Sequence, residues 1–365
     1  MKIKDVMTSL EAMAPPFLQE GYDNAGLITG DENAECTGIL ISLDATAAVV
    51  DEAKKKSCNL IVSHHPIVFS GLKKITGKNY VQKAVINAIK NDIALYAIHT
   101  NLDNVLNGVN GKIAELLELK NISVLAPKES QLKKLYTFVP VTDAGKVRQA
   151  IFDAGGGHIG KYDECSFNVE GFGTFRGGSN TDPYVGKPGE LHKENEIKVE
   201  VIFPSWLEGR ILKSLLAAHP YEEVAFDIIK LDNRFSSIGS GVFGELKEAA
   251  AEKTFLKTLK EKFKLNIIRH TQLLNKPISK VAVCGGAGSF LISSALAAGA
   301  DCFITSDIKY HEFFDANDRM VIADIGHYES EQFTINLLQE FLEQKFPTFA
   351  VLKTEVNTNP VRYFL

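Results

Sequence analysis

The stretch ILISLDATAAVVDEAKKKSCNLIVSHHPIVF, residues 39–69, carries the pattern that decides the fold. It holds two short apolar runs on either side of a segment with helical spacing, and the second run ends at Ser63–Pro66. Short apolar runs without alternation are typical of parallel strands that are buried on both faces. The stretch therefore predicts a strand, helix and strand of an open α/β sheet.

Apolar runs of this kind recur along the chain, and each is followed by polar or ionisable residues or by glycine. Ligands of open α/β sheets bind outside the carboxyl ends of the strands, so these residues are expected to converge. The runs are residues 38–42, 60–62, 93–98, 281–284, 302–305 and 320–323. The residues that follow them are Asp44, Ser63 with His64 and His65, His99, Gly285 with Gly286, Asp307, and Asp324 leading to His327.

The two ends of the chain share one layout. Residues 281–314 repeat the order of strand, helix, strand and polar segment that residues 39–69 show, and each half then adds one further strand. His99 and Asp103 are four residues apart, as are His327 and Glu331. We therefore predict two similar α/β lobes, residues 1–127 and 241–365, which face each other and complete one split domain.

Residues 128–240 show a different pattern. Their order of strand, helix, two strands, helix and strand is that of ferredoxin-like domains. Residues 177–190 are rich in glycine and proline and predict a loop within this segment. An insertion whose ends lie close together can leave the parent fold intact. We predict an inserted ferredoxin-like α+β domain.

Composition excludes several classes of protein. The 365 residues are 45% hydrophobic, and the net charge of −5 comes from 40 basic and 45 acidic residues that are interspersed. No basic surface for nucleic acid is predicted. No apolar stretch reaches the roughly 18–20 residues of a membrane span, and the N-terminus lacks the core of a signal peptide, so we expect a cytoplasmic protein without a membrane partner. The five cysteines are scattered and predict buried thiols.

The motif SHHP places His64 and His65 at a strand end. Adjacent imidazoles there could face two neighbouring ions, and neutral imidazole suits zinc, iron, manganese or nickel. The alternative is a pair of hydrogen-bonded histidines in a turn.

The motifs HTNLDN and GHYESE each add a histidine and a carboxylate. Asp103 could bridge two cations, or it could cap the helix that follows. His327 and Glu331 lie one helical turn apart and could reach one centre. A solvated helix start would explain the glutamate but not the histidine.

Other motifs favour structural roles. Residues 23–27, DNAGL, resemble a turn. Residues 285–289, GGAGS, could cradle a phosphate, but a tight turn between strand and helix is favoured. Asp307 and His311 could bind a substrate or cap a helix, and His219 is expected to be structural.

The motifs YDNAGL, SHHP, HTNLDN and GHYESE, in that order, resemble the NIF-three-like family, also catalogued as GTP cyclohydrolase 1 type 2 homologues. The resemblance covers residues 1–127 and 241–365, with Tyr22 where the family usually has tryptophan. It makes His99 a near neighbour of the metal site. It places the ligands of the family's dinuclear metal site on His64, His65, Asp103, His327 and Glu331.

The resemblance also implies two divalent metal ions per chain, of zinc, iron or manganese, and a toroidal homohexamer whose metal sites face an internal cavity. HPYEEVAFDI, residues 219–228, is similar to the PII-like and divalent-cation-tolerance proteins. The family name does not establish GTP cyclohydrolase activity.

Two functions follow as hypotheses. The first is a metal-dependent hydrolase of a small nucleotide-like or phosphorylated molecule, in which Asp103 and Glu331 bridge the ions and His99 or His311 moves protons. The second is a non-catalytic metal-binding or regulatory assembly whose insert senses a small-molecule ligand. A scaffold for protein or nucleic acid has the weakest support, since no basic or aromatic stripe is present.

Overall fold

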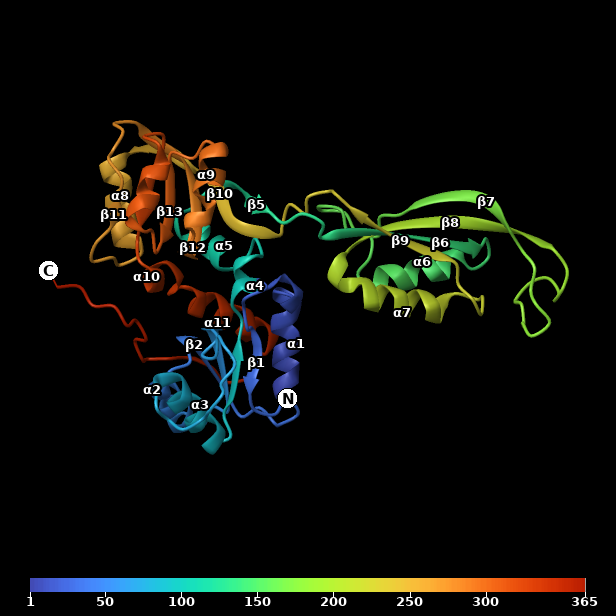
Figure 1. The fold of residues 1–365 in the computed structure, drawn as a ribbon, viewed down its shortest axis with the longest axis horizontal. Coiled ribbons are helices and arrows are strands. Elements are labelled where there is room, and N and C mark those ends of the chain that lie inside the picture. Colours follow the sequence, from blue (N-terminus) through green and yellow to red (C-terminus); the bar gives the residue numbers. More distant parts are fainter. Residues whose placement is uncertain (365) are drawn as a thin grey trace. The chain divides into compact units, whose positions relative to one another are not determined.

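The computed structural model describes residues 1–364. The chain divides into two compact units. Unit 1 consists of Met1–Pro127 and Ser236–Leu365, and unit 2 consists of Lys128–Phe235. Unit 1 contains two sheets and unit 2 contains one (Figure 1). Both units therefore combine helices with sheets, which agrees with the mixed α and β content that the sequence predicted.

The first sheet of unit 1 has five strands in the order β1-β4-β3-β2-β15. Its three central strands and β15 are parallel, whereas β1 is antiparallel to β4. The parallel strands end at His65 and just before His99, which brings both histidines to one edge. The strands are β1 (Gly26–Thr29), β2 (Ile39–Asp44), β3 (Leu60–His65), β4 (Ala94–Ala97) and β15 (Val351–Lys353).

Helices cover both faces of this sheet. Leu40, Ile61 and Leu95 are register partners on one face and pack against the apolar sides of α2 and α3. Thr46 and Asn79 cap these two helices through their side chains. Tyr96 points to the other face. The helices associated with this sheet are α1 (Ile3–Met13), η1 (Pro16–Leu18), α2 (Ala47–Lys55), α3 (Tyr80–Lys90), α4 (Thr100–Asp103) and α11 (Thr334–Lys345).

The second sheet of unit 1 has six strands in the order β11-β14-β13-β12-β10-β5. Here β12, β13 and β14 are parallel, and the other pairings are antiparallel. The predicted parallel strands thus form two sets in two sheets. The strands are β5 (Lys120–Pro127), β10 (Gly239–Ala251), β11 (Arg269–His270), β12 (Pro277–Ala287), β13 (Cys302–Ser306) and β14 (Val321–Asp324).

Two strands cross between the halves of unit 1. β5 comes from the N-terminal segment but pairs with β10 of the C-terminal segment, and β15 comes from the C-terminal segment but pairs with β2. Each sheet therefore depends on both segments of the chain. The remaining helices of unit 1 are α5 (Val109–Leu116), α8 (Glu252–Lys262), η3 (Ser289–Leu291), α9 (Ile292–Ala297), η4 (Tyr310–Ala316) and α10 (His327–Glu331).

Unit 2 contains a four-stranded antiparallel sheet in the order β7-β8-β6-β9. One face of the sheet packs against both helices through a core that includes Val139, Phe203, Ile211 and Leu215. The elements are β6 (Leu132–Pro140), α6 (Ala144–Asp153), β7 (Phe167–Phe175), β8 (His192–Pro204), η2 (Ser205–Leu207), α7 (Glu208–Ala218) and β9 (Phe226–Leu231).

All five cysteines are free thiols, and four of them are buried. None of the helices within residues 1–364 combines the length and apolarity of a membrane span.

Candidate metal centre

The first two histidines of the site, His64 and His65, lie at the end of β3. His64 is fully buried, and its Nδ1 lies 2.9 Å from the carbonyl oxygen of Ile98. A carbonyl oxygen only accepts hydrogen bonds, so Nδ1 donates and Nε2 of the neutral ring keeps its lone pair. Burial favours this neutral form, because it lowers the pKa of His64.

The lone pair of His64 faces carboxylates. Its Nε2 lies 3.6 Å from Oδ1 of Asp103 and 3.8 Å from Oε1 of Glu331. Among the described residues, neither His64 Nε2 nor Asp103 Oδ1 has a hydrogen-bond partner, although both atoms are buried. Buried polar atoms are nearly always satisfied in native proteins. Two unsatisfied acceptors that face each other fit a cation held between them.

Asp103 is the last residue of α4. Burial, together with the negative charge of Glu331, raises its pKa well above the ordinary value. The alternative in which Asp103 caps the next helix is wrong, since α5 begins at Val109 and its N-cap is Gly108. The side chain is thus directed to the histidines for a reason other than capping.

The short helix α10 supplies His327 and Glu331. Oε2 of the buried Glu331 lies 3.2 Å from Nε2 of His327 and 3.0 Å from Nε2 of His65. Burial opposes ionisation of Glu331, but hydrogen bonds from the histidines outweigh it and hold its pKa well below the ordinary value. Both side chains therefore reach one centre, as their spacing predicted.

Hydrogen bonds between histidines and Glu331 lie where a metal could bind. Burial disfavours charge on both His65 and His327, but their hydrogen bonds to carboxylates outweigh it. The pKa of His65 is raised to about 9 and that of His327 to about 11. A divalent cation would replace these protons as the positive charge beside Glu331.

All four histidines of the site are oriented through Nδ1. The partners are the carbonyl oxygen of Ile98 for His64, Asp44 at 2.8 Å for His65, Asp23 at 2.7 Å for His99 and Asp307 at 2.6 Å for His327. Metal-binding histidines usually donate their second nitrogen to a carboxylate or a carbonyl, which fixes the ring and its tautomer. Nε2 is therefore the nitrogen of each ring that could bind a metal, and in His65 and His327 it lies beside Glu331.

Asp23 is a site residue that the sequence assigned only to a turn. Burial opposes ionisation of its carboxyl group, but hydrogen bonds from His99 and Thr100 lower its pKa to about 2. The ionised carboxylate therefore holds His99 in place. The DNAGL motif was the signal, but its partner lies 76 residues away.

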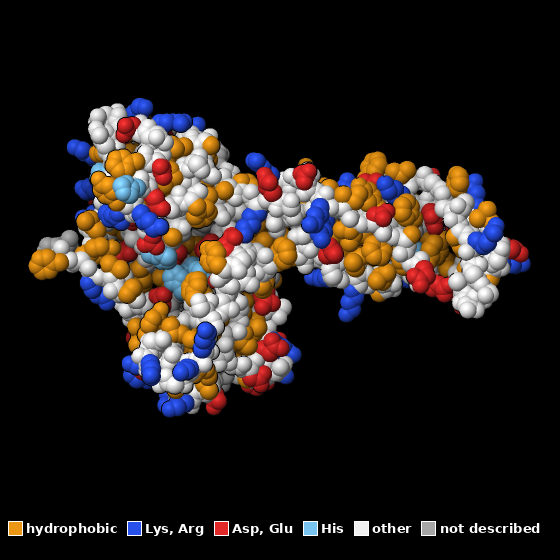
Figure 2. Space-filling view, in the orientation of Figure 1, with side chains coloured by type: hydrophobic (Ala, Val, Ile, Leu, Met, Phe, Trp, Pro, Cys, Tyr) orange, Lys and Arg blue, Asp and Glu red, His pale blue; other side chains and the backbone are white. Residues whose placement is uncertain are grey.

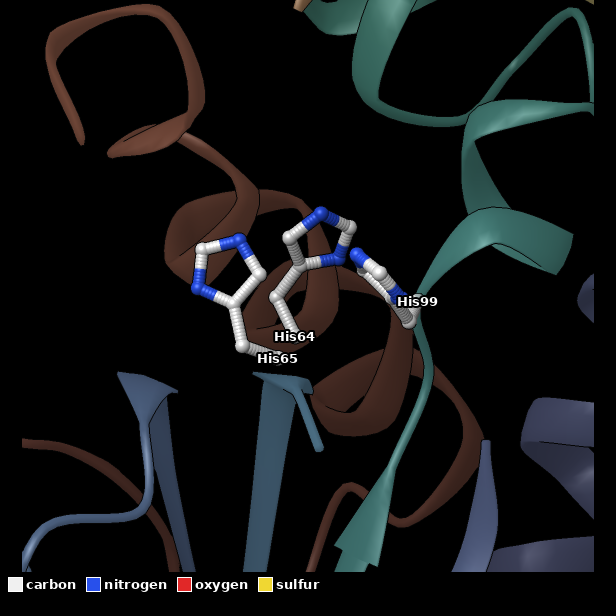
Figure 3. A group of neighbouring side chains, drawn as sticks. All are labelled: His64, His65 and His99. Carbon is white, nitrogen blue, oxygen red and sulfur yellow. The ribbon is translucent and has the colours of Figure 1, made fainter. Parts of the chain in front are cut away.

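The ligand atoms form two groups that share His65. One contains His64, His65 and His99, and the other contains His65, His327 and Glu331; within each group these atoms lie within 4.8 Å of one another. Figure 3 shows the first group, with two rings above the end of β3 and the third on the segment after β4. Histidine side chains gather in a hollow of unit 1 (Figure 2). The residues present fit a metal ion.

The glycines of GGAGS make room for Glu331. A Cβ atom at Gly286, which has a φ of +66°, would lie 2.3 Å from Oε1 of Glu331. The N–H of Gly285 donates to Asn110 and that of Gly286 donates to Ser330. These amides are therefore already used, and the phosphate cradle is not supported.

The structure does not bring every predicted residue to the centre. His311 lies exposed on η4 with its ring beside Tyr310 and Phe314, and it belongs to neither ligand group. Asp307 orients His327 instead of capping a helix. Both ring nitrogens of His219 are bonded to the backbone, as a structural role requires.

A cavity of about 360 Å³ adjoins the site. Its wall includes His65, His327 and Arg269. The guanidinium of Arg269 donates to Asp324 at 3.0 Å and to the carbonyl oxygen of Ile308 at 2.9 Å. A small molecule bound there would contact both the histidines and a fixed positive charge.

Comparisons with known proteins agree over the whole chain. The family model Duf34/NIF3 (NGG1p interacting factor 3) matches residues 1–360. A GTP cyclohydrolase 1 type 2 homolog of Halalkalibacterium halodurans is 37% identical over 371 residues, which cover 100% of both chains. A Bacillus subtilis protein of the same name is 35% identical over 369 residues, 99% of this chain and 98% of the relative.

Solved structures of NIF3-related proteins are also similar to this chain over its full length. A Bacillus cereus protein related to NIF3 superposes with a TM-score of 0.87 and 37% identity, covering 100% of this chain and 99% of that one. A Staphylococcus aureus protein, SA1388, superposes with a TM-score of 0.79 and 31% identity over 100% and 99%. The chain belongs to the Duf34/NIF3 family.

Proposed function

We propose that the chain binds two divalent metal ions through His64, His65, Asp103, His327 and Glu331, and that it hydrolyses a small nucleotide-like or phosphorylated molecule. The observation that carries the metal proposal is the pair of buried, unsatisfied atoms, His64 Nε2 and Asp103 Oδ1, at 3.6 Å. The two groups that share His65 support adjacent ions of zinc, iron or manganese, with His99 in the first group and Asp103 outside both.

Two bound ions would supply positive charge that stabilises an oxyanion and acidifies water. Arg269 lies on the wall of the adjoining cavity, but it is paired with Asp324 and four carboxylates share that wall, so an anionic substrate would depend on the bound ions for compensating charge. Asp23 holds the Nδ1 proton of His99, so Nε2 of that ring can take up a proton from a reacting group. His99 is the proposed proton acceptor. Proton transfer by His311 stays a prediction, since His311 belongs to neither group of candidate metal ligands.

The names of the relatives extend this proposal. Those relatives are called GTP cyclohydrolase 1 type 2 homologs, so GTP belongs in the substrate panel.

We also propose that the protein is a cytoplasmic homohexamer. The exposed rings of Tyr310 and Phe314 in unit 1, with centroids 5.8 Å apart, support a subunit interface, because exposed apolar patches are typical of interaction sites.

We propose further that unit 2, Lys128–Phe235, which makes up most of the predicted insert 128–240, is a ferredoxin-like domain of the PII-like kind inserted between the two segments of unit 1. The element order β6-α6-β7-β8-α7-β9 and the sheet order β7-β8-β6-β9 support it. The second candidate function, a non-catalytic metal-binding assembly whose insert senses a ligand, would use the same metal residues without turnover.

A substrate screen tests the proposal. Protein treated with a chelator and reloaded with Zn²⁺, Mn²⁺ or Fe²⁺ is assayed against nucleotides, GTP included, and phosphomonoesters. We expect metal-dependent hydrolysis that His64→Ala abolishes and that His158→Ala, an exposed control in unit 2, leaves unchanged. Reversible metal uptake without turnover on any member of the panel would favour the second candidate.

A further inference from the structure

Unit 2 contains a cavity of about 640 Å³ whose lining residues all belong to that unit. It is bordered by β7, the loop after β7, β8 and the segment between α7 and β9. Cavities that bind small organic molecules have volumes of about 300–1,000 Å³. This cavity is therefore large enough for a ligand of metabolite size.

Aromatic side chains make up much of the cavity wall. Phe172 and Tyr184 are more than half exposed in the ligand-free chain. The ring of Tyr221 lies 6.0 Å from that of Phe175 and 6.2 Å from that of Tyr184, measured between centroids. Aromatic faces bind apolar groups and also attract cations through the negative charge of the ring face.

A buried carboxylate, that of Glu196 on β8, lies against this wall. The residue is 8% exposed, and its Oε1 accepts a hydrogen bond of 2.9 Å from the hydroxyl of Tyr221. Burial and the nearby charge of Glu196 raise the pKa of Tyr221, so its hydroxyl stays a neutral donor. A buried carboxylate is costly unless a positive group compensates it.

The neighbouring strand β7 is shaped to accept this carboxylate. A Cβ atom at Gly173 would lie 2.2 Å from Oε2 of Glu196, so a larger residue there would force the end of the Glu196 side chain to move. The hydrogen bond from Tyr221 and the space at Gly173 together favour the observed position of the carboxylate.

The charges around the cavity are mostly negative. Lys198 is already engaged, since its Nζ donates to Glu200 at 2.8 Å and lies 4.2 Å from the ring centroid of Tyr136. An acidic excess disfavours phosphorylated ligands and favours cations. The charged residues of the lining are the acidic Glu170, Glu196, Glu222 and Glu223 and the basic Arg176 and Lys198.

We propose that this cavity binds a small organic cation, an aromatic or apolar body that carries one protonated amine. The amine pairs with Glu196, and the body packs against Phe175 and Tyr184, since one face of the Phe172 ring already carries the ammonium group of Lys193 at 3.7 Å from the ring centroid. The proposal does not depend on the metal site or on hydrolysis, and it gives unit 2 a ligand class of its own.

Calorimetric titration of the full, metal-free chain tests the charge preference. The probes are tryptamine, which carries an ammonium group, and indole-3-propionate, which carries a carboxylate on a similar body. We expect saturable binding of tryptamine at one site per chain, with an affinity at least about tenfold higher than that for indole-3-propionate. Absence of saturable tryptamine binding, or equal affinity for both probes, overturns the proposal.

Variants locate the site. Glu196→Gln keeps the shape of the side chain and an acceptor for Tyr221, and we expect it to weaken tryptamine binding by about tenfold or more. Glu190→Gln, at an exposed position outside the lining, is the matched control and should bind as the wild type does. Wild-type affinity in Glu196→Gln contradicts the proposal. Should Glu196→Gln fail to fold, Gly173→Ala provides the same test, because it displaces the carboxylate.

Discussion

Two histidine–carboxylate pairs of the candidate metal centre have the same spacing but different geometry. His327 and Glu331 both lie within α10, and their side chains meet at 3.2 Å. His99 precedes α4 as its N-cap, with φ −114° and ψ −112°, and its ring bonds to Asp23, whereas Asp103 faces His64. A separation of four residues therefore brings side chains together only when both residues are helical.

The two carboxylates also differ in charge. Glu331 is surrounded by histidines and has a lowered pKa, whereas Asp103 has a raised pKa because it is buried beside Glu331. Glu331 is thus a paired anion, whereas burial and the charge of Glu331 oppose ionisation of Asp103. The predictions below use this difference.

The largest effect is expected for Glu331→Ala. The substitution removes a ligand of the proposed site and leaves the protonated His65 and His327 without their shared anion. We expect loss of bound metal and destabilisation of the metal-free protein by about 3–5 kcal/mol, measured by elemental analysis and denaturant unfolding. Glu329→Ala is the neighbouring control, and an equal loss of metal there would indicate a general disruption of α10.

Asp103→Asn should weaken metal binding without changing the free energy of unfolding of the metal-free protein. The amide resembles the neutral carboxyl group in shape, so the metal-free protein should unfold within about 0.5 kcal/mol of the wild type. Metal binding should still be lost or strongly weakened, because the amide lacks the negative charge of a bridging ligand. A metal-free variant destabilised as much as Glu331→Ala would refute the difference in charge between the two carboxylates.

The smallest effects concern the residues that orient the rings. Asp307→Asn should weaken metal binding by about 10–100-fold, because it loosens His327, a proposed ligand.

Asp23→Asn should leave the metal content unchanged and lower turnover, because it loosens His99, the proposed proton acceptor. Competition with a chelating dye measures both affinities. Equal weakening by the two substitutions would make His99 a metal ligand instead.

The sequence predicted those parts of the site that depend on local pattern. Buried strands end at His65 and just before His99 because continuous apolar runs mark parallel strands. Helical spacing predicted that His327 and Glu331 would meet. These features are determined by residues that are close together in the sequence, so the sequence alone is enough to predict them.

Features that depend on distant pairing were not predicted. The exchange of β5 and β15 between the sheets rests on backbone pairing across more than 100 residues. Asp23 acts through His99, and Gly286 acts by leaving space for Glu331. No local pattern encodes these contacts. His311 follows a strand end, but η4 turns its ring toward Tyr310.

The ratio of metal to chain tests the central claim most directly. Protein loaded with Zn²⁺ or Mn²⁺, freed of excess metal by dialysis and analysed for its elements should contain two ions per chain, and His64→Ala should lose them. A ratio of one or less, or a ratio that His64→Ala leaves unchanged, would contradict the proposed dinuclear centre.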